Sequence, residues 1–180
     1  MKKKILIITG VALVVFAGVF FWLNSRNRTL SPSGTANGKI GDLEINMSYS
    51  RPSVRGRVIF GTEEEGALLV YGKYWRLGAN EPTSVSFSRD VSFNGNRVPA
   101  GKYRIYAFPG KDTFEVVLNT EIGMWGAAEP DYSKDLLKTS IPVVRLDKPV
   151  EQLTFYVKPS GSGLNIVIYW ADVGLSIPVQ

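Results

Sequence analysis

The feature that most constrains the fold is an alternation of apolar and polar residues with a period of two, which begins at Leu43. In the first run, Ile45, Met47 and Tyr49 alternate with Glu, Asn and Ser. This alternation is typical of a β-strand that buries one face in a core and leaves the other face in solvent. Similar short runs recur as far as the C-terminus, so we expect the larger part of the chain to be built of strands.

Turn sequences separate these runs at close intervals. Asn94-Gly95 favours a two-residue hairpin because both residue types tolerate a positive φ, and SGSG at residues 160–163 predicts a flexible hairpin loop. The best helix candidate beyond residue 28 is short, at residues 130–138. The sequence therefore predicts an all-β domain over residues 42–180, an antiparallel β-sandwich or closely related barrel of about ten short strands.

An uncharged apolar run precedes the predicted domain. Three lysines lie ahead of residues 5–23, a stretch of nineteen residues without a charge. As a helix this run would be roughly 28 Å long, about the thickness of the hydrocarbon core of a bilayer. It ends in FFWLN, a poor match to the small-x-small site of a cleaved signal peptide. We expect residues 1–23 to be a retained signal anchor, with a cleaved signal peptide as the main alternative and a buried soluble helix as the weakest.

The flanking residues predict the orientation and the connection to the domain. The three lysines and the α-amino group precede the span, whereas Arg26 and Arg28 follow it, which favours a cytoplasmic N-terminus. The domain would then be extracytoplasmic, and periplasmic in a Gram-negative cell. Residues 24–41 are rich in Ser, Asn, Gly and Thr, so we expect a flexible tether there.

Composition removes several classes of function. Of the 21 cations, five flank the predicted anchor, which leaves 16 cations against 16 acids in the remainder. A neutral domain is a poor partner for nucleic acid. Cysteine and histidine are both absent, so disulfides, a thiol nucleophile, Ser-His activation and the commonest zinc ligands are excluded. We therefore predict no metal and no cofactor.

Several motifs carry a resemblance to a known family. They are SRPSVRGRVIFG at residues 50–61, YGKYWRLGANEPT at 71–83, FS at 87–88, PAGKY at 99–103, FPG at 108–110 and WG at 125–126. Together they resemble the bacterial domain of unknown function 2911 family, over most of residues 43–180. The resemblance implies an exported protein, largely of Bacteroidetes-type bacteria, and it brings no established activity.

The string YWRLGANEPT is the strongest candidate for a functional site. Trp, Arg, Asn, Glu and Thr gather there without the apolar alternation of a strand. One interpretation is a polar brace between the sheets, in which an Arg76–Glu81 fork fixes the loop and Trp75 covers it. The other is a pocket for a small polar ligand, with an aromatic platform and polar contacts. Its predicted residues are Arg57, Trp75, Arg76, Asn80, Glu81, Thr83 and Trp125.

Neighbouring residues leave further alternatives open. Arg55 and Arg57, with Arg51 if a strand continues through Pro52, would share a face and either bind a carboxylate or phosphate group or pair with acids. Trp170 ends an apolar alternation and is expected in the core. Glu81 is a weak candidate for catalysis, because carboxylate-based hydrolysis needs a second acid in the same cleft.

The sequence thus predicts a membrane-tethered, extracytoplasmic β-sandwich without an assigned reaction. The best-supported role is to bind a small polar ligand or glycan, or a protein of the cell envelope. The alternatives are a carboxylate-based hydrolase that uses Glu81, and a structural or assembly module in which the motif is only a brace. The expected membrane contact is through residues 5–23.

Overall fold

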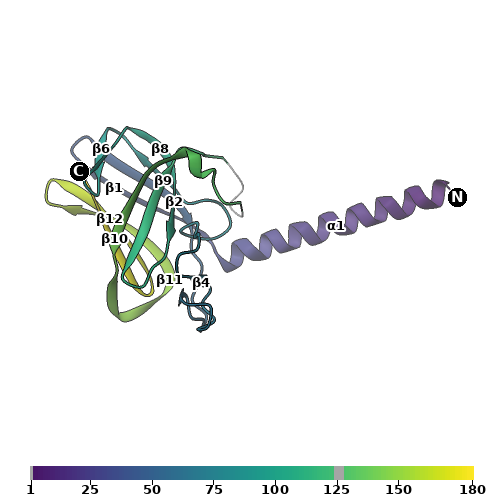
Figure 1. The fold of residues 1–180 in the computed structure, drawn as a ribbon. Coiled ribbons are helices and arrows are strands. Elements are labelled where there is room, and N and C mark those ends of the chain that lie inside the picture. The colour runs from purple at the N-terminus through teal and green to yellow at the C-terminus, as the bar shows by residue number, and fades with distance from the viewer. Residues whose placement is uncertain (1, 124–127) are drawn as a thin grey trace.

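A long N-terminal helix leads into a β-domain. The computed structural model describes the backbone of residues 2–123 and 128–180, and the side chains of this range from Thr9 onward. Helix α1 (Lys2–Leu30) projects away from the domain, as Figure 1 shows. Its segment Thr9–Leu30 is long and apolar enough to cross a membrane, a character that signal sequences share, and it is not buried by the domain. The prediction of an apolar N-terminal helix is confirmed.

The prediction of a flexible tether at residues 24–41 is wrong, because most of this segment has regular secondary structure. α1 continues to Leu30, and β1 (Ser33–Ile40) pairs along its whole length with β2 (Leu43–Ser50). Most side chains of β1 are exposed or half-buried, but the segment is a paired strand with a close packing contact at Gly38. A Cβ placed on Gly38 would lie 2.4 Å from Cγ1 of Val157, so only glycine fits the close approach of β1 to the opposite sheet.

The strands form two larger sheets and one small pair. A six-stranded sheet has the order β1-β2-β5-β8-β9-β10, and a four-stranded sheet has the order β11-β12-β6-β7; their pairs are antiparallel. The parallel pair β3-β4 stands apart. The remaining bounds are β3 (Phe60–Gly61), β4 (Leu69–Val70), β5 (Ser84–Phe87), β6 (Val91–Phe93), β7 (Asn96–Val98), β8 (Gly101–Phe108), β9 (Thr113–Asn119), β10 (Asp135–Pro142), β11 (Val144–Ser160) and β12 (Gly163–Val179).

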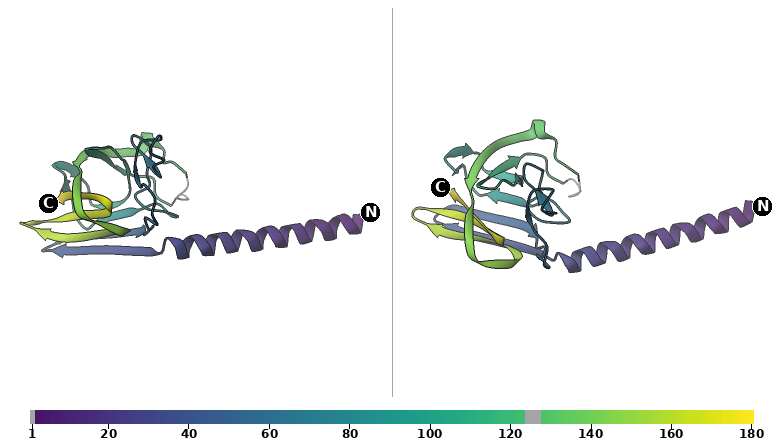
Figure 2. Two further views of the ribbon diagram at one scale, coloured as in Figure 1. Left: turned by 90° about the horizontal axis from the view of Figure 1, so that it is seen from below. Right: turned by 60° about the horizontal axis from the view of Figure 1, so that its bottom comes forward.

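The two sheets enclose one hydrophobic core, which confirms the sandwich-like all-β prediction. The views in Figure 2 show the two layers from the side. In β2, Leu43, Ile45, Met47 and Tyr49 are all buried, as their period of two predicts. Trp170 of β12 is 2% exposed and belongs to the core, also as predicted.

The helix expected within residues 130–138 is much shorter than predicted. Only η1 (Tyr132–Lys134) is helical, as a single 3₁₀ turn, and the chain enters β10 at Asp135. Asp131 caps this turn by accepting a hydrogen bond from the backbone N–H of Ser133. β10 then pairs with β9, so the ladder of the six-stranded sheet overrides the local preference for a longer helix.

Candidate functional site

The YWRLGANEPT loop begins with a residue that is anchored to the six-stranded sheet. Trp75 exchanges two backbone hydrogen bonds with Ala107 of β8, at 2.8 and 2.9 Å. Its indole is only 3% exposed and stacks on Trp170, with ring centroids 5.8 Å apart and planes 23° apart. Phe60 meets it edge-on at 5.3 Å. Trp75 is therefore mainly a core residue. The pocket interpretation, which made it an aromatic platform for a ligand, is corrected on this point.

The centre of the loop is folded tightly against the sheet. Leu77 and Asn80 have positive φ angles of 53° and 56°. The hydroxyl of Thr83 is fully buried and donates to the carbonyl oxygen of Leu77 at 2.8 Å. A Cβ on Gly78 would lie 3.1 Å from the carbonyl oxygen of Ser50, closer than most real contacts. This half of the motif is a brace, in which the buried hydroxyl of Thr83 is used by the backbone of the loop.

The fork expected between Arg76 and Glu81 does not form. Nη1 of Arg76 donates to the backbone carbonyl of Asn80 at 3.2 Å, within the same loop. Glu81 instead forms a salt bridge with Arg28 of α1. The physical reason is that the C-terminal end of α1 lies against the loop, so a cation from outside the motif is available to the carboxylate.

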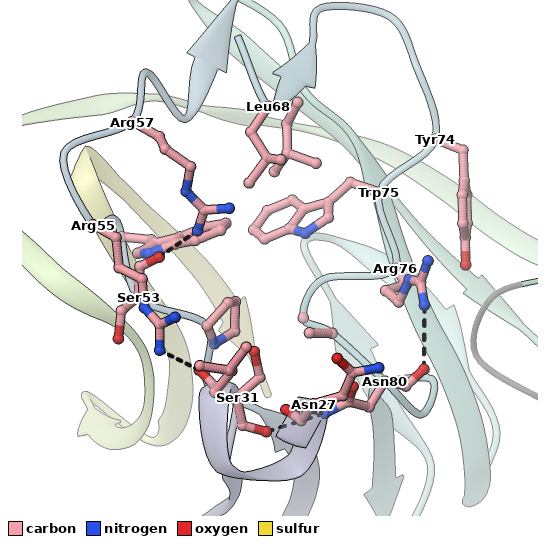
Figure 3. Close-up of a pocket in the computed structure, with 16 residues that line it drawn as sticks. Asn27, Ser31, Ser53, Arg55, Arg57, Leu68, Tyr74, Trp75, Arg76 and Asn80 are labelled. Carbon is pink, nitrogen blue, oxygen red and sulfur yellow. Dashed lines mark hydrogen bonds between the residues drawn. The ribbon is translucent and has the colours of Figure 1, made fainter. Parts of the chain in front are cut away.

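Polar side chains of the domain also close the end of α1. Nδ2 of Asn80 donates to the carbonyl oxygens of Ser31 at 3.1 Å and Asn27 at 3.4 Å. Nη2 of Arg55 donates to the carbonyl oxygen of Leu30 at 3.3 Å. The last carbonyls of a helix lack intrahelical partners and carry a partial negative charge, which suits an amide and a guanidinium. Figure 3 shows Asn80, Asn27 and Ser31 together at this junction.

Arg57 is held on the opposite side of the same region. Its Nη2 donates to the carbonyl oxygen of Ser53 at 2.6 Å and its Nε to that of Val54 at 3.0 Å. Arg51 lies apart and donates instead to Leu153 and Thr154. The prediction that Arg51, Arg55 and Arg57 share one face of a strand is wrong. The chain turns between them, and Arg55 has a φ of 53°.

These elements surround a cavity of about 460 Å³. Figure 3 shows Arg57 and Arg55 on one side, Arg76 and Asn80 on the other, and Trp75 with Leu68 between them. The lining residues are Asn27, Leu30, Ser31, Pro52, Ser53, Arg55, Arg57, Leu68, Leu69, Tyr74, Trp75, Arg76, Gly78, Ala79, Asn80 and Trp170. Within the part of the chain that the structure describes, the lining has three arginines and no carboxylate.

The structure brings four of the seven predicted site residues to this cavity. They are Arg57, Trp75, Arg76 and Asn80. Glu81 and Thr83 line a neighbouring cavity of about 510 Å³, and Trp125 lies outside the described residues. Sequence reasoning gave Arg55 no place in the pocket, although its spacing from Arg57 was noted. It had no signal for Asn27, Leu30 and Ser31, which come from the segment expected to be a tether.

The neighbouring cavity contains a buried cation that the sequence did not reveal. Arg104 of β8 is 2% exposed, and its Nη2 donates to the hydroxyl of Tyr74 at 2.5 Å and to the carbonyl of Ala128 at 2.7 Å. Burial raises the pKa of Tyr74, which keeps this phenol neutral. Tyr74 lines the first cavity and Arg104 the second, so their hydrogen bond connects the walls of the two cavities.

The two carboxylates at the neighbouring cavity, Glu81 and Glu121, are each paired with a cation. Lys134 donates to Glu121 at 2.8 Å and lowers its pKa, and Arg28 pairs with Glu81. General acid catalysis by a carboxyl group at neutral pH needs a raised pKa, the opposite of the shift at Glu121. The arrangement gives the hydrolase alternative no support.

A family model described as protein of unknown function (DUF2911) matches residues 31–179. The chain belongs to this family. The match starts directly after α1 and covers the whole β-domain, so it confirms the resemblance found in the motifs. No curated protein and no solved structure matches the chain.

Proposed function

We propose that this DUF2911 protein is a membrane-anchored, extracytoplasmic binding module whose cavity takes a small anionic ligand. The observation that carries the proposal is the imbalance of charge in the cavity lining. Arg55, Arg57 and Arg76 line it without a carboxylate, and within the described residues none of the three forms a salt bridge. A carboxylate, sulfate or phosphate group would supply the missing negative charge.

Backbone carbonyls hold the three guanidiniums in position without neutralising them. A guanidinium has five N–H donors. Among the described residues, Arg57 uses two of them on Ser53 and Val54, whereas Arg55 and Arg76 use one each. The remaining donors are available to a ligand, and the fixed geometry lowers the entropy lost on binding. Arginine is also the residue best suited to two-point recognition of carboxylate and phosphate.

The apolar part of the lining suggests that the ligand is more than a bare ion. Leu30, Leu68 and Leu69 accompany the edges of Trp75 and Trp170. Small-molecule sites commonly combine an apolar surface with a few polar groups that fix orientation. An anionic group attached to an apolar or sugar-like body would match both parts of this cavity.

The C-terminal end of α1 is built into the β-domain. Asn80 and Arg55 satisfy its terminal carbonyls, and Arg28 pairs with Glu81. All these contacts lie beyond residue 23, so the anchor is supported instead by the length and apolar character of Thr9–Leu30 and by the poor cleavage site at FFWLN. With the three N-terminal lysines in the cytoplasm, the β-domain would lie outside the membrane.

A thermal-shift titration of the full chain in mild detergent tests the proposal. Phosphate, sulfate, acetate and glucuronate are compared with glucose as a neutral probe. We expect at least one anion to raise Tm in the wild type, and Arg57→Gln and Arg76→Gln to weaken the effect. Arg97→Gln is the matched control, since Arg97 lies on β7 with its side chain 84% exposed. Equal shifts in all four proteins would refute an anion site in this cavity.

A further inference from the structure

We infer that the anionic group bound in this cavity is the phosphate of a membrane lipid headgroup, taken from the leaflet into which the distal end of α1 runs. The inference rests on the proposed function and adds the source and class of the ligand to it. It is carried by the position of the cavity relative to the end of the membrane helix, and by the exposed apolar residues at its rim.

The cavity lies a short distance above the apolar core of the bilayer. The uncharged run ends at residue 23, and α1 continues without a break to Leu30. At 1.5 Å per residue, Asn27 lies roughly 6 Å and Leu30 roughly 10 Å beyond that end. The polar headgroup layer is about 5–8 Å thick on each side. Because both residues line the cavity, its wall begins within or directly above the headgroup layer.

Interfacial residues of α1 agree with this placement. The guanidinium of Arg26 lies 5.6 Å from the centroid of the Trp22 ring. Tryptophan and arginine at the end of an apolar helix are typical of the membrane–water interface. The level of the interface is thereby fixed near Trp22, about one helical turn below Asn27.

An exposed apolar surface lies beside the cavity. Leu68 and Val58 are joined by a backbone hydrogen bond of 3.0 Å, and they are 46% and 50% exposed. Leu68 lines the cavity, and the loop that carries both residues lies at the end of the domain from which α1 leaves (Figures 1 and 2). Apolar side chains in this position can contact acyl chains while the arginines hold the phosphate.

The charge distribution favours a specific lipid site over general adsorption of the domain to an anionic membrane surface. Apart from the residues that flank the span, the chain carries equal numbers of cations and acids, so the domain as a whole is not attracted to an anionic surface. Three guanidiniums gathered on one cavity provide a local attraction instead. Guanidinium and phosphate form paired, charge-assisted hydrogen bonds, which would select a phosphate over a neutral headgroup.

Native mass spectrometry of the full chain, released from mild detergent, tests the inference. Dioleoylphosphatidylglycerol is compared with dioleoylglycerol, which has the same acyl chains and no phosphate. We expect one phosphatidylglycerol per chain and no retained dioleoylglycerol. The Arg57→Gln/Arg76→Gln double variant should bind phosphatidylglycerol at least about tenfold more weakly, since each lost contact is charge-assisted. Arg97→Gln should bind it as the wild type does. The melting temperatures of the lipid-free variants verify that they are folded.

A second arm distinguishes a lipid from a soluble anion. Inorganic phosphate and sn-glycerol 3-phosphate are titrated into the same proteins, with the thermal shift as readout. If they stabilise the wild type through Arg57 and Arg76 while phosphatidylglycerol does not bind, the lipid inference fails and the anion site stands. If the double variant retains phosphatidylglycerol fully, or dioleoylglycerol binds equally well, the lipid surrounds α1 and the inference fails. If no probe depends on the two arginines, both proposals fail.

Discussion

Nδ2 of Asn80 donates a hydrogen bond of 3.1 Å to the carbonyl oxygen of Ser31, so a loop of the β-domain closes the end of the N-terminal helix. The same residue accepts a hydrogen bond from Arg76 through its backbone carbonyl. Asn80 therefore connects the helix end to one of the three cavity arginines. Brace and pocket wall, which were alternatives for the motif, are combined in one residue.

Replacing Asn80 with glycine should loosen the end of α1 while leaving the β-domain folded. Glycine accepts the φ of 56° without strain, so the variant removes only the side-chain amide. We expect faster hydrogen exchange at the amide of Ser31, which donates to Asn27 within the last turn. Asn94→Gly is the control, since Asn94 also has a positive φ but lies in the hairpin between β6 and β7. Unchanged exchange at Ser31 would mean that the amide does not hold the helix end.

Thr83→Val should destabilise the fold through one hydrogen bond. The substitution keeps the shape of the side chain but leaves the carbonyl of Leu77 without its donor in a fully buried position. The expected loss is about 1–3 kcal/mol in the free energy of unfolding, measured by urea titration. Thr120→Val removes a similar bond to Lys134 at an exposed site, where water replaces it, so its effect should be much smaller. Equal losses would contradict the bracing role of Thr83.

Trp75→Ala should lower the free energy of unfolding far more than Arg57→Gln does. The indole packs in the core against Trp170, Phe60 and Phe114, and its removal should lower the free energy of unfolding by about 3–5 kcal/mol. Arg57→Gln should change it by less than about 0.5 kcal/mol, as for most surface substitutions. Chemical denaturation measures both. A small loss for Trp75→Ala would indicate that the indole serves the cavity rather than the core.

Stability should decrease at acid pH through the cluster around η1. Lys134 lowers the pKa of Glu121 below its usual 4.5, and the hydrogen bonds from Ser133 lower that of Asp131 below 3.8. The folded state therefore binds these protons less readily than the unfolded state does. The stabilisation is present above the usual values and is lost as the pH falls through the lower, folded-state values.

The melting temperature measured from pH 7 to pH 3 checks this dependence. Glu121→Gln removes one titrating group and keeps an oxygen that can accept from the backbone of Asp131. Its melting temperature should vary less steeply than that of the wild type below about pH 4.5. Parallel curves would show that Glu121 does not contribute to the acid sensitivity.

The sequence predicted the sandwich well because local alternation reports directly on a buried face. Ile45 and Met47 could be assigned to the core without knowledge of their partners. The same approach misread residues 33–40, because a strand at a sheet edge exposes most of its side chains and resembles a polar linker. The constraint on Gly38 comes from Val157, which is too distant in sequence for any local pattern to show.

The candidate site was predicted in part for the same reason. Their polar side chains made Arg57, Arg76 and Asn80 candidates for the site, and the structure places all three at one cavity. The partners themselves depend on tertiary contacts. Glu81 pairs with Arg28 because the helix docks beside the loop, an arrangement that spacing within the motif does not encode.

The direct passage from α1 into β1 also has a mechanical consequence. Only Ser31 and Pro32 separate the helix from a strand that is paired with β2 in eight consecutive positions. A pull on the domain against its anchor would load this antiparallel ladder along the strand direction, so its hydrogen bonds would resist together in shear rather than open one after another. The junction would then transmit tension between the β-domain and α1 without first extending a slack linker.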